Sequence, residues 1–104
     1  MDKTTITAII NFFKTELQQK GVKLRGIALF GSQLTGTSNP DSDIDLIIVS
    51  DNFQDKTIFE RSDITMDTEI KALKKYNMPM DILKMTNEEF NQGIQNKRFY
   101  AQMV

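Results

Sequence analysis

The chain has 104 residues, and its 13 basic and 14 acidic residues leave a net charge of -1. A chain of this length is expected to form one domain with one hydrophobic core. No basic block is longer than Lys74-Lys75, so the charge pattern does not suggest general binding to nucleic acids. Because cysteine and histidine are both absent, zinc sites and histidine general bases are excluded, and any metal would be bound by oxygen atoms.

Membrane and export signals are not evident in the sequence. No apolar run approaches the ~20 residues that a membrane-spanning helix needs. The first residues also lack the charged, apolar and small-residue regions of a signal peptide. We therefore expect a cytoplasmic protein that does not associate with membranes.

The first half of the chain predicts one helix followed by two strands. Apolar residues recur at helical spacing over residues 4–20, and Lys20-Gly21 is typical of a helix end. Residues 22–30 and 46–49 predict strands that are largely buried. The small and polar residues 35–42 between them predict a surface loop.

The second half predicts a helix, a third strand and a further helix. The first of these helices is expected over residues 63–76, where Asn77 and Pro79 would end it, and residues 80–85 predict the strand. Thr86 to Glu89 has the pattern of a capping box that begins the last helix. Residues 97–104 are unusually apolar for a terminus, and we expect them either to pack on the sheet or to meet a partner.

Two aspartates, Asp43 and Asp45, lie where the second strand is expected to begin. Because side chains alternate along a strand, both carboxylates project from the same face. Two neighbouring carboxylates repel each other unless a cation lies between them or one takes a proton. Mg²⁺ suits such a place, since it binds a few carboxylates and shares its other positions with water and substrate phosphates.

Gly31 and Ser32 follow the first predicted strand directly. The glycine lets a ligand approach the backbone, and Ser32 adds a hydroxyl group beside its own amide where a helix could begin. These two residues therefore predict a phosphate-binding turn that faces the acidic pair.

The pattern resembles the DNA polymerase beta-like nucleotidyltransferases, whose signature is Gly-Ser, a gap and then Asp-x-Asp on the next strand. Gly31-Ser32, Gly36 and Ser42-Asp43-Ile44-Asp45-Leu46 carry the match, which is closest to the minimal MNT-type members of bacteria and archaea. The resemblance implies an α/β (α+β) fold in which helices pack against a small mixed β-sheet. It also implies a single minimal nucleotidyltransferase domain over residues 1–104.

The resemblance further implies a role for each motif residue. Asp43 and Asp45 would hold Mg²⁺ or Mn²⁺ against the triphosphate of ATP or another NTP, while Gly31 and Ser32 would bind its outer phosphates. In the family, a third carboxylate on the following strand completes the metal site and takes the acceptor's proton. Asp81 matches it, being the only acid in a strand-like context after residue 45. The implied reaction moves a nucleotide, most simply AMP, onto a hydroxyl acceptor and releases pyrophosphate.

Similar minimal members are commonly paired with a small helical HEPN protein. They act as antitoxins by adenylylating a tyrosine of that toxin, which is a form of AMPylation. The apolar C-terminus is compatible with such a partner or with a homodimer, so the resemblance leaves the acceptor open.

One departure from the family pattern keeps other interpretations open. Many minimal relatives carry a basic residue just after Gly-Ser, whereas residues 33–35 are uncharged here. The triphosphate would then be held by Arg25, Lys56, Arg61 or a partner. Alternatively, the chain is a catalytically weak or inactive module of the same fold that acts by binding a partner. A third interpretation is that the acidic strand end is merely solvated.

Overall fold

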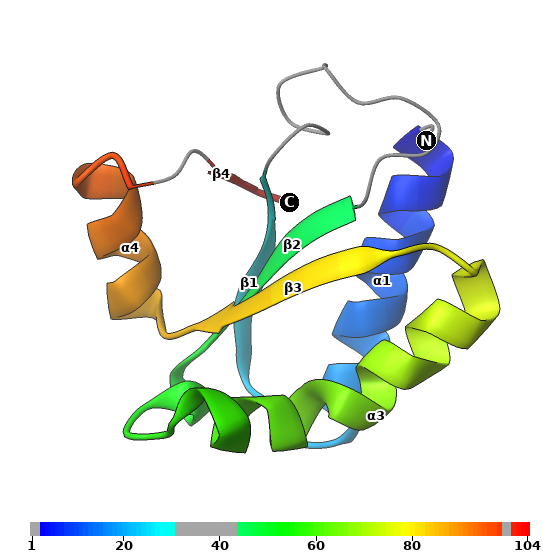
Figure 1. Ribbon diagram of the computed structural model, residues 1–104, viewed down its shortest axis with the longest axis horizontal. Helices are drawn as coiled ribbons and strands as arrows, with labels where there is room; N and C mark the ends of the chain where they lie inside the picture. Colours follow the sequence, from blue (N-terminus) through cyan, green and yellow to red (C-terminus); the bar gives the residue numbers. More distant parts are fainter. Residues whose placement is uncertain (1–2, 31–43, 99–100) are drawn as a thin grey trace.

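The computed structural model describes residues 3–30, 44–98 and 101–104. Within these residues, a four-stranded sheet lies between helices on both faces (Figure 1). The helices are α1 (Lys3–Gln19), α3 (Ile58–Tyr76), α4 (Asn87–Gln95) and the short 3-10 helix η1 (Asp51–Phe53). The strands are β1 (Leu24–Phe30), β2 (Ile44–Ser50), β3 (Met80–Met85) and β4 (Ala101–Met103). None of the helices described is both long and apolar enough to cross a membrane.

The sheet is mixed, with the spatial order β3-β2-β1-β4. β1 pairs with β2 and with β4 in antiparallel fashion, and β2 pairs with β3 in parallel. The parallel pair is joined through α3, as a strand, crossover helix and strand in one sheet normally are. The predicted fold class, helices against a small mixed sheet, is therefore confirmed.

The core forms two layers because β2 is buried on both faces. Ile44, Leu46 and Ile48 face α1 and α3, whereas Ile47 and Val49 face α4. The first layer contains Phe13 and Leu17 of α1, Phe53 of η1 and Ala72 of α3, and the second contains Ala28 of β1 and Phe90 of α4. Alternation along β2 thus decides which side chains turn toward which helices.

α3 begins at Ile58, earlier than the predicted start at Asp63. Thr57 caps it: its hydroxyl accepts a hydrogen bond from the Glu60 amide at 3.2 Å, and the Glu60 carboxylate accepts one from the Thr57 amide at 2.8 Å. The predicted boundary was wrong because Ile58 and Phe59 are exposed and do not follow the buried stripe. The capping-box pattern from Thr57 to Glu60 would have predicted the correct start of α3.

Thr57→Ala should lower the free energy of unfolding by about 1 kcal/mol, because the first turn of α3 would lose its side-chain acceptor. Equilibrium unfolding in urea measures this change. Thr57→Ser keeps the hydroxyl and is expected to lose much less stability. An equal loss in both variants would show that the methyl group, and not the cap, matters.

The C-terminal residues pack on the sheet, which is one of the two outcomes expected for them. β4 pairs with the end of β1, and the Val104 amide donates a hydrogen bond to the Ile27 carbonyl at 2.9 Å. A strand of three residues was not predicted, since its pattern is too short to show alternation.

Thr65 and Thr68 of α3 are both fully buried, but their hydroxyl groups differ. The Thr65 hydroxyl donates a hydrogen bond to Glu69, whereas that of Thr68 has no partner among the described residues. Thr68→Val should therefore raise the free energy of unfolding by up to about 1 kcal/mol, and Thr65→Val should lower it by about as much. Urea denaturation of both variants checks this, and equal destabilisation would contradict it.

Candidate active site

Asp45 and Asp81 lie side by side near the beginning of two parallel strands. The register of β2 and β3 pairs them directly, and neighbouring strands are about 4.8 Å apart. Asp45 is partly buried and Asp81 is exposed. Asp45 shares a face of the sheet with Ile47, and Asp81 shares the same face with Leu83, because residues two apart in a strand point the same way. Both carboxylates therefore project from the face that α4 covers toward the other end of these strands.

Phe30 belongs to the same row across the sheet. It pairs with Asp45 on one side and with Ala101 of β4 on the other. The sequence pattern predicted that the strand ends at Phe30, directly before Gly31, but not that Phe30 lies beside Asp45, because that place depends on the antiparallel register of β1 and β2. As Gly31 follows Phe30 in the chain, this register brings the strand end before Gly31-Ser32 next to Asp45.

Three of the predicted site residues, Gly31, Ser32 and Asp43, lie outside the described residues. Their roles therefore stay predictions. Asp45 and Asp81 are the two members of the predicted set that the structure places, and it brings them together.

The donor atoms at this end of the sheet suit a hard divalent cation. Two carboxylates on adjacent strands repel each other, and an oxygen-binding ion such as Mg²⁺ would offset that repulsion. Among the described residues, no group of three or more acidic, histidine or cysteine side chains could hold a metal ion. Completing such a site would therefore require Asp43, whose predicted place is one residue before β2.

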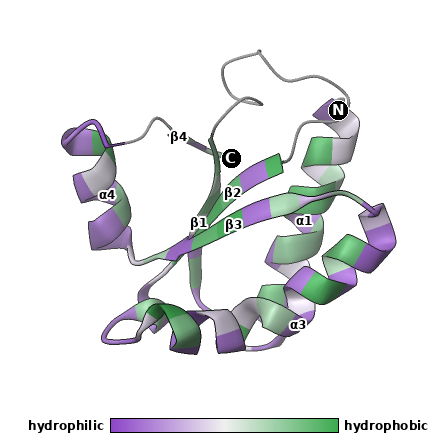
Figure 2. Cartoon of the chain, in the orientation of Figure 1, coloured by the Kyte–Doolittle hydropathy of each residue, from purple (hydrophilic) through white to green (hydrophobic). Residues whose placement is uncertain are grey.

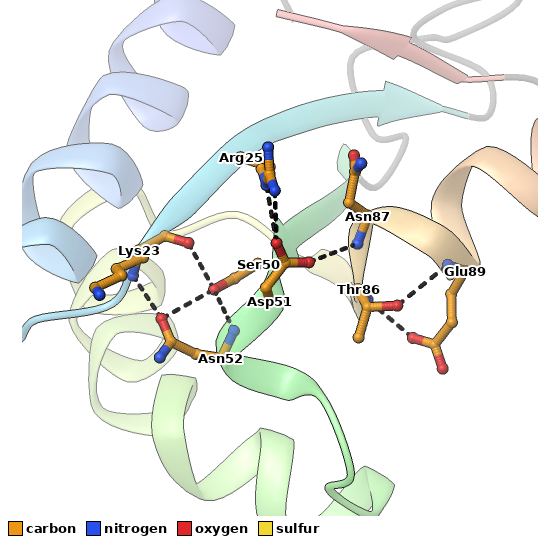
Figure 3. A network of polar contacts seen from close by, with 8 residues as sticks. All are labelled: Lys23, Arg25, Ser50, Asp51, Asn52, Thr86, Asn87 and Glu89. Carbon is orange, nitrogen blue, oxygen red and sulfur yellow. Dashed lines mark hydrogen bonds and ion pairs between the residues drawn. The ribbon is translucent and has the colours of Figure 1, made fainter.

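The basic residues suggested as phosphate ligands lie at the opposite end of the sheet. Arg25 pairs with Asp51, their nitrogen and oxygen atoms being 2.9 Å apart, and Asp51 directly follows β2 (Figure 3). Asp45 is five residues before Ser50, which is roughly 16 Å along a strand. The suggestion that Arg25 holds the triphosphate is therefore wrong for this structure.

Arg61 is likewise held far from the acidic pair. Its guanidinium group donates to both carboxylate oxygens of Glu89, at 2.6 and 3.1 Å, and to the Lys84 carbonyl at 3.0 Å. Lys84 lies near the end of β3, opposite to Asp81. The Lys56 carbonyl accepts another hydrogen bond from Arg61, so Lys56 lies at this far end too. Neither residue is placed to reach a phosphate bound at Asp45.

The described residues thus form an α/β protein with a mixed sheet, and an acidic pair lies at one end of two of its strands. The family model described as nucleotidyltransferase domain matches residues 10–103. The chain therefore belongs to the nucleotidyltransferase domain family, and the resemblance inferred from its motif is confirmed.

One solved structure supports this fold, and a second is similar over part of its length. A candidate nucleotidyltransferase from Sulfolobus solfataricus matches with a TM-score of 0.63 and 18% identity, over 99% of this chain and 87% of that one. A toxin-antitoxin structure with AMP-PNP matches with a TM-score of 0.44 and 24% identity, over 67% of this chain and 52% of that one. The second likeness is too weak to support any conclusion about fold or function. Among curated proteins, none matched the chain.

Proposed function

We propose that the protein transfers a nucleotide, AMP from ATP in the simplest case, to a hydroxyl acceptor in a reaction that depends on Mg²⁺ or Mn²⁺. The observation that carries this proposal is the direct pairing of Asp45 with Asp81, in the same row as the strand end before Gly31. Membership of the nucleotidyltransferase domain family supports the reaction class.

In this proposal, Asp43, Asp45 and Asp81 hold the metal ion, and Gly31 and Ser32 bind the outer phosphates. The ion, when bound, would offset the charge of the triphosphate and make the acceptor hydroxyl more acidic. The Asp81 carboxylate takes the proton of that hydroxyl, whose oxygen forms a bond to the α-phosphorus. The bond from the α-phosphorus to the bridging oxygen breaks, and pyrophosphate leaves.

Transfer of label from α-³²P-ATP tests the proposal. The intact protein, with Mg²⁺ or Mn²⁺, is incubated with a lysate of the source organism beside an Asp43→Asn, Asp45→Asn double variant. Label on a discrete species with the intact protein alone would support transfer and identify the acceptor. Nucleotide binding without any transfer would count against it.

We also propose a helical HEPN-type protein as the acceptor, modified on a tyrosine. The support is the resemblance of Gly31-Ser32 and Asp43-Ile44-Asp45 to minimal antitoxin nucleotidyltransferases. Mass spectrometry of the labelled species would show AMP on a tyrosine of a second protein. Label on nucleic acid or on a small molecule would overturn this part and leave transfer itself intact.

A second candidate function is binding of a partner with little or no transfer. It is favoured by the position of Arg25 and Arg61, whose side chains are paired with acids at the far end of the sheet. Nucleotide-independent binding of the partner that survives the Asp43→Asn, Asp45→Asn change would support it. Loss of the complex in that variant would contradict it.

A further inference from the structure

A row of apolar side chains lies exposed along the outer side of α3. Its members are Phe59, Met66, Ile70 and Leu73, which are 79%, 50%, 45% and 51% exposed. Their spacing of three, four and seven residues places them on one side of the helix, opposite to the buried residues Thr65, Thr68 and Ala72. α3 lies at the outer edge of the molecule (Figure 1), and apolar residues alternate with polar ones along it (Figure 2). We call these four residues the α3 stripe.

A groove with a volume of about 370 Å³ opens beside the C-terminal part of the α3 stripe. Its walls include Leu73 of α3 together with Pro79 and Met80, where β3 begins. At the other end of the same helix stands Phe59, and no large apolar side chain among the described residues is more exposed. The helix therefore carries an apolar projection at one end and an apolar groove at the other.

We propose that two copies of this chain associate through the α3 stripe, with their α3 helices antiparallel about a twofold axis. A twofold axis makes the same surface face itself, so a projection and a groove at opposite ends of one helix fill each other twice. An axis between Met66 and Ile70 places Phe59 of each copy opposite the end of the other α3, next to the groove. The 19 residues of α3 extend about 28 Å, which is enough for such a contact.

The charges beside the α3 stripe favour the same arrangement. On the side toward α1, Asp63 and Asp67 lie in the first half of α3, and Lys71 and Lys74 lie in the second half. Contacts from Asp67 to Lys20 and from Lys71 toward Glu16 identify this side. In the antiparallel pair, Asp63 of one copy comes within one helical turn of Lys74 of the other. In a parallel pair about a twofold axis, the α1-facing sides of the two helices would lie on opposite sides of the contact, so these opposite charges would not meet.

The outer edge of β3 is a less suitable place for a partner. The Pro79 carbonyl accepts a hydrogen bond from the Ile44 amide and therefore points toward β2. Because carbonyls alternate in direction along a strand, those of Ile82 and Lys84 point away from β2, toward the free edge of β3. The Ile82 carbonyl accepts a hydrogen bond from Lys84 Nζ at 3.2 Å, and the Lys84 carbonyl accepts one from Arg61 at 3.0 Å. Side chains that occupy an edge in this way hinder the addition of another strand. In this proposal a second copy therefore binds through the side chains of the α3 stripe and not by adding a strand to β3.

This association does not depend on the proposed transfer reaction. Met80 packs toward α1 and α3, whereas Asp81 projects from the other face. The contact would thus end beside the candidate active site and leave its carboxylates accessible. A failed dimer would not argue against transfer, nor would missing transfer argue against the dimer.

Sedimentation equilibrium of the full chain over a range of concentrations tests the proposal. We expect a dimer with a micromolar dissociation constant, as for a modest interface, which Phe59→Glu weakens at least ~10-fold. Ile94→Glu is the matched control, because Ile94 is an apolar residue 38% exposed on α4. Circular dichroism verifies that both variants keep their helices. A monomer at every concentration, or equal effects of the two changes, would overturn the proposal.

A charge exchange tests the antiparallel direction separately. Asp63→Lys and Lys74→Asp should each weaken the dimer, since each places like charges together across the axis. The double variant restores opposite charges and should recover most of the lost affinity. Because both residues are exposed, the fold should tolerate each change. A double variant that dimerises more weakly than both single variants would overturn the arrangement.

Discussion

Asp81→Asn is expected to lower kcat for nucleotide transfer by a factor of about 10² to 10⁴, the loss typical when a general base or a charge-stabilising group is removed. Asparagine has nearly the same shape but cannot take the proton of the acceptor. Steady-state transfer of α-³²P-AMP measures this change, with kcat and KM for the nucleotide determined separately. Because Asp81 is exposed, the variant should fold as the parent protein does.

Asp45→Asn should act differently, since Asp45 is proposed solely as a ligand of the metal-nucleotide complex, whereas Asp81 in addition takes the proton of the acceptor hydroxyl. We expect a lower kcat together with a higher KM for the nucleotide, whereas Asp81→Asn should change KM less. Asp63→Asn is a matched control, because Asp63 is an exposed acid on α3 outside the site. Full activity in Asp81→Asn would remove Asp81 from the mechanism. Equal losses in all three variants would show that net charge, and not the site, is responsible.

The sequence was sufficient for those features that depend on short-range patterns. The third strand, predicted over residues 80–85, is β3, and the capping box at Thr86 begins α4. Asp81 was assigned to the strand that follows the predicted helix. A strand that returns after a crossover helix normally lies in the same sheet as its predecessor, and the observed register pairs Asp81 directly with Asp45. The local pattern and the topological rule together place these two carboxylates at the same end of the sheet.

Features that depend on distant partners could not be predicted in this way. Phe30 lies beside Asp45 because of a register between antiparallel strands, and β4 is defined by its pairing with β1. Arg61 precedes the helix predicted over residues 63–76, and it was suggested as a ligand of the triphosphate. It lies instead in the second turn of α3, where Glu89, a residue 28 positions later, holds it. No pattern around Arg61 indicates that partner.

Arg61 should be a strong determinant of stability. Its side chain is 13% exposed, and its guanidinium group donates to Glu89 and to the carbonyls of Lys84 and Lys56. It thereby joins the first turns of α3 to β3 and α4. Arg61→Ala removes these charged hydrogen bonds and should lower the free energy of unfolding by about 2 kcal/mol near neutral pH. Urea denaturation measures the loss, and Arg61→Lys, which cannot make the same paired contact, should recover only part of it.

The same contact predicts how stability changes in acid. The hydrogen bond from Arg61 lowers the pKa of Glu89 below its ordinary value of 4.5, and the Thr86 amide lowers it further. A group with a lowered pKa in the folded state stabilises the protein above its unfolded pKa, and this contribution disappears as the pH falls through the folded pKa. Part of the stability at neutral pH should therefore be lost on acidification below about pH 4.5. In Arg61→Ala this loss should be smaller, because the main cause of the lowered pKa is gone.

Glu89→Gln separates the charge of Glu89 from its role as a cap. Glutamine still offers an oxygen to the Thr86 amide, which now donates to Glu89 at 2.8 Å, but it has no proton to gain in this range. The variant should be less stable than the parent at neutral pH, and the difference should narrow as the pH falls below about 4. Free energies of unfolding of the parent protein and of Glu89→Gln, measured from neutral pH down to below about pH 4, test this expectation. A difference that stays constant would mean that Arg61 and Glu89 stabilise the protein by packing and not through their charges.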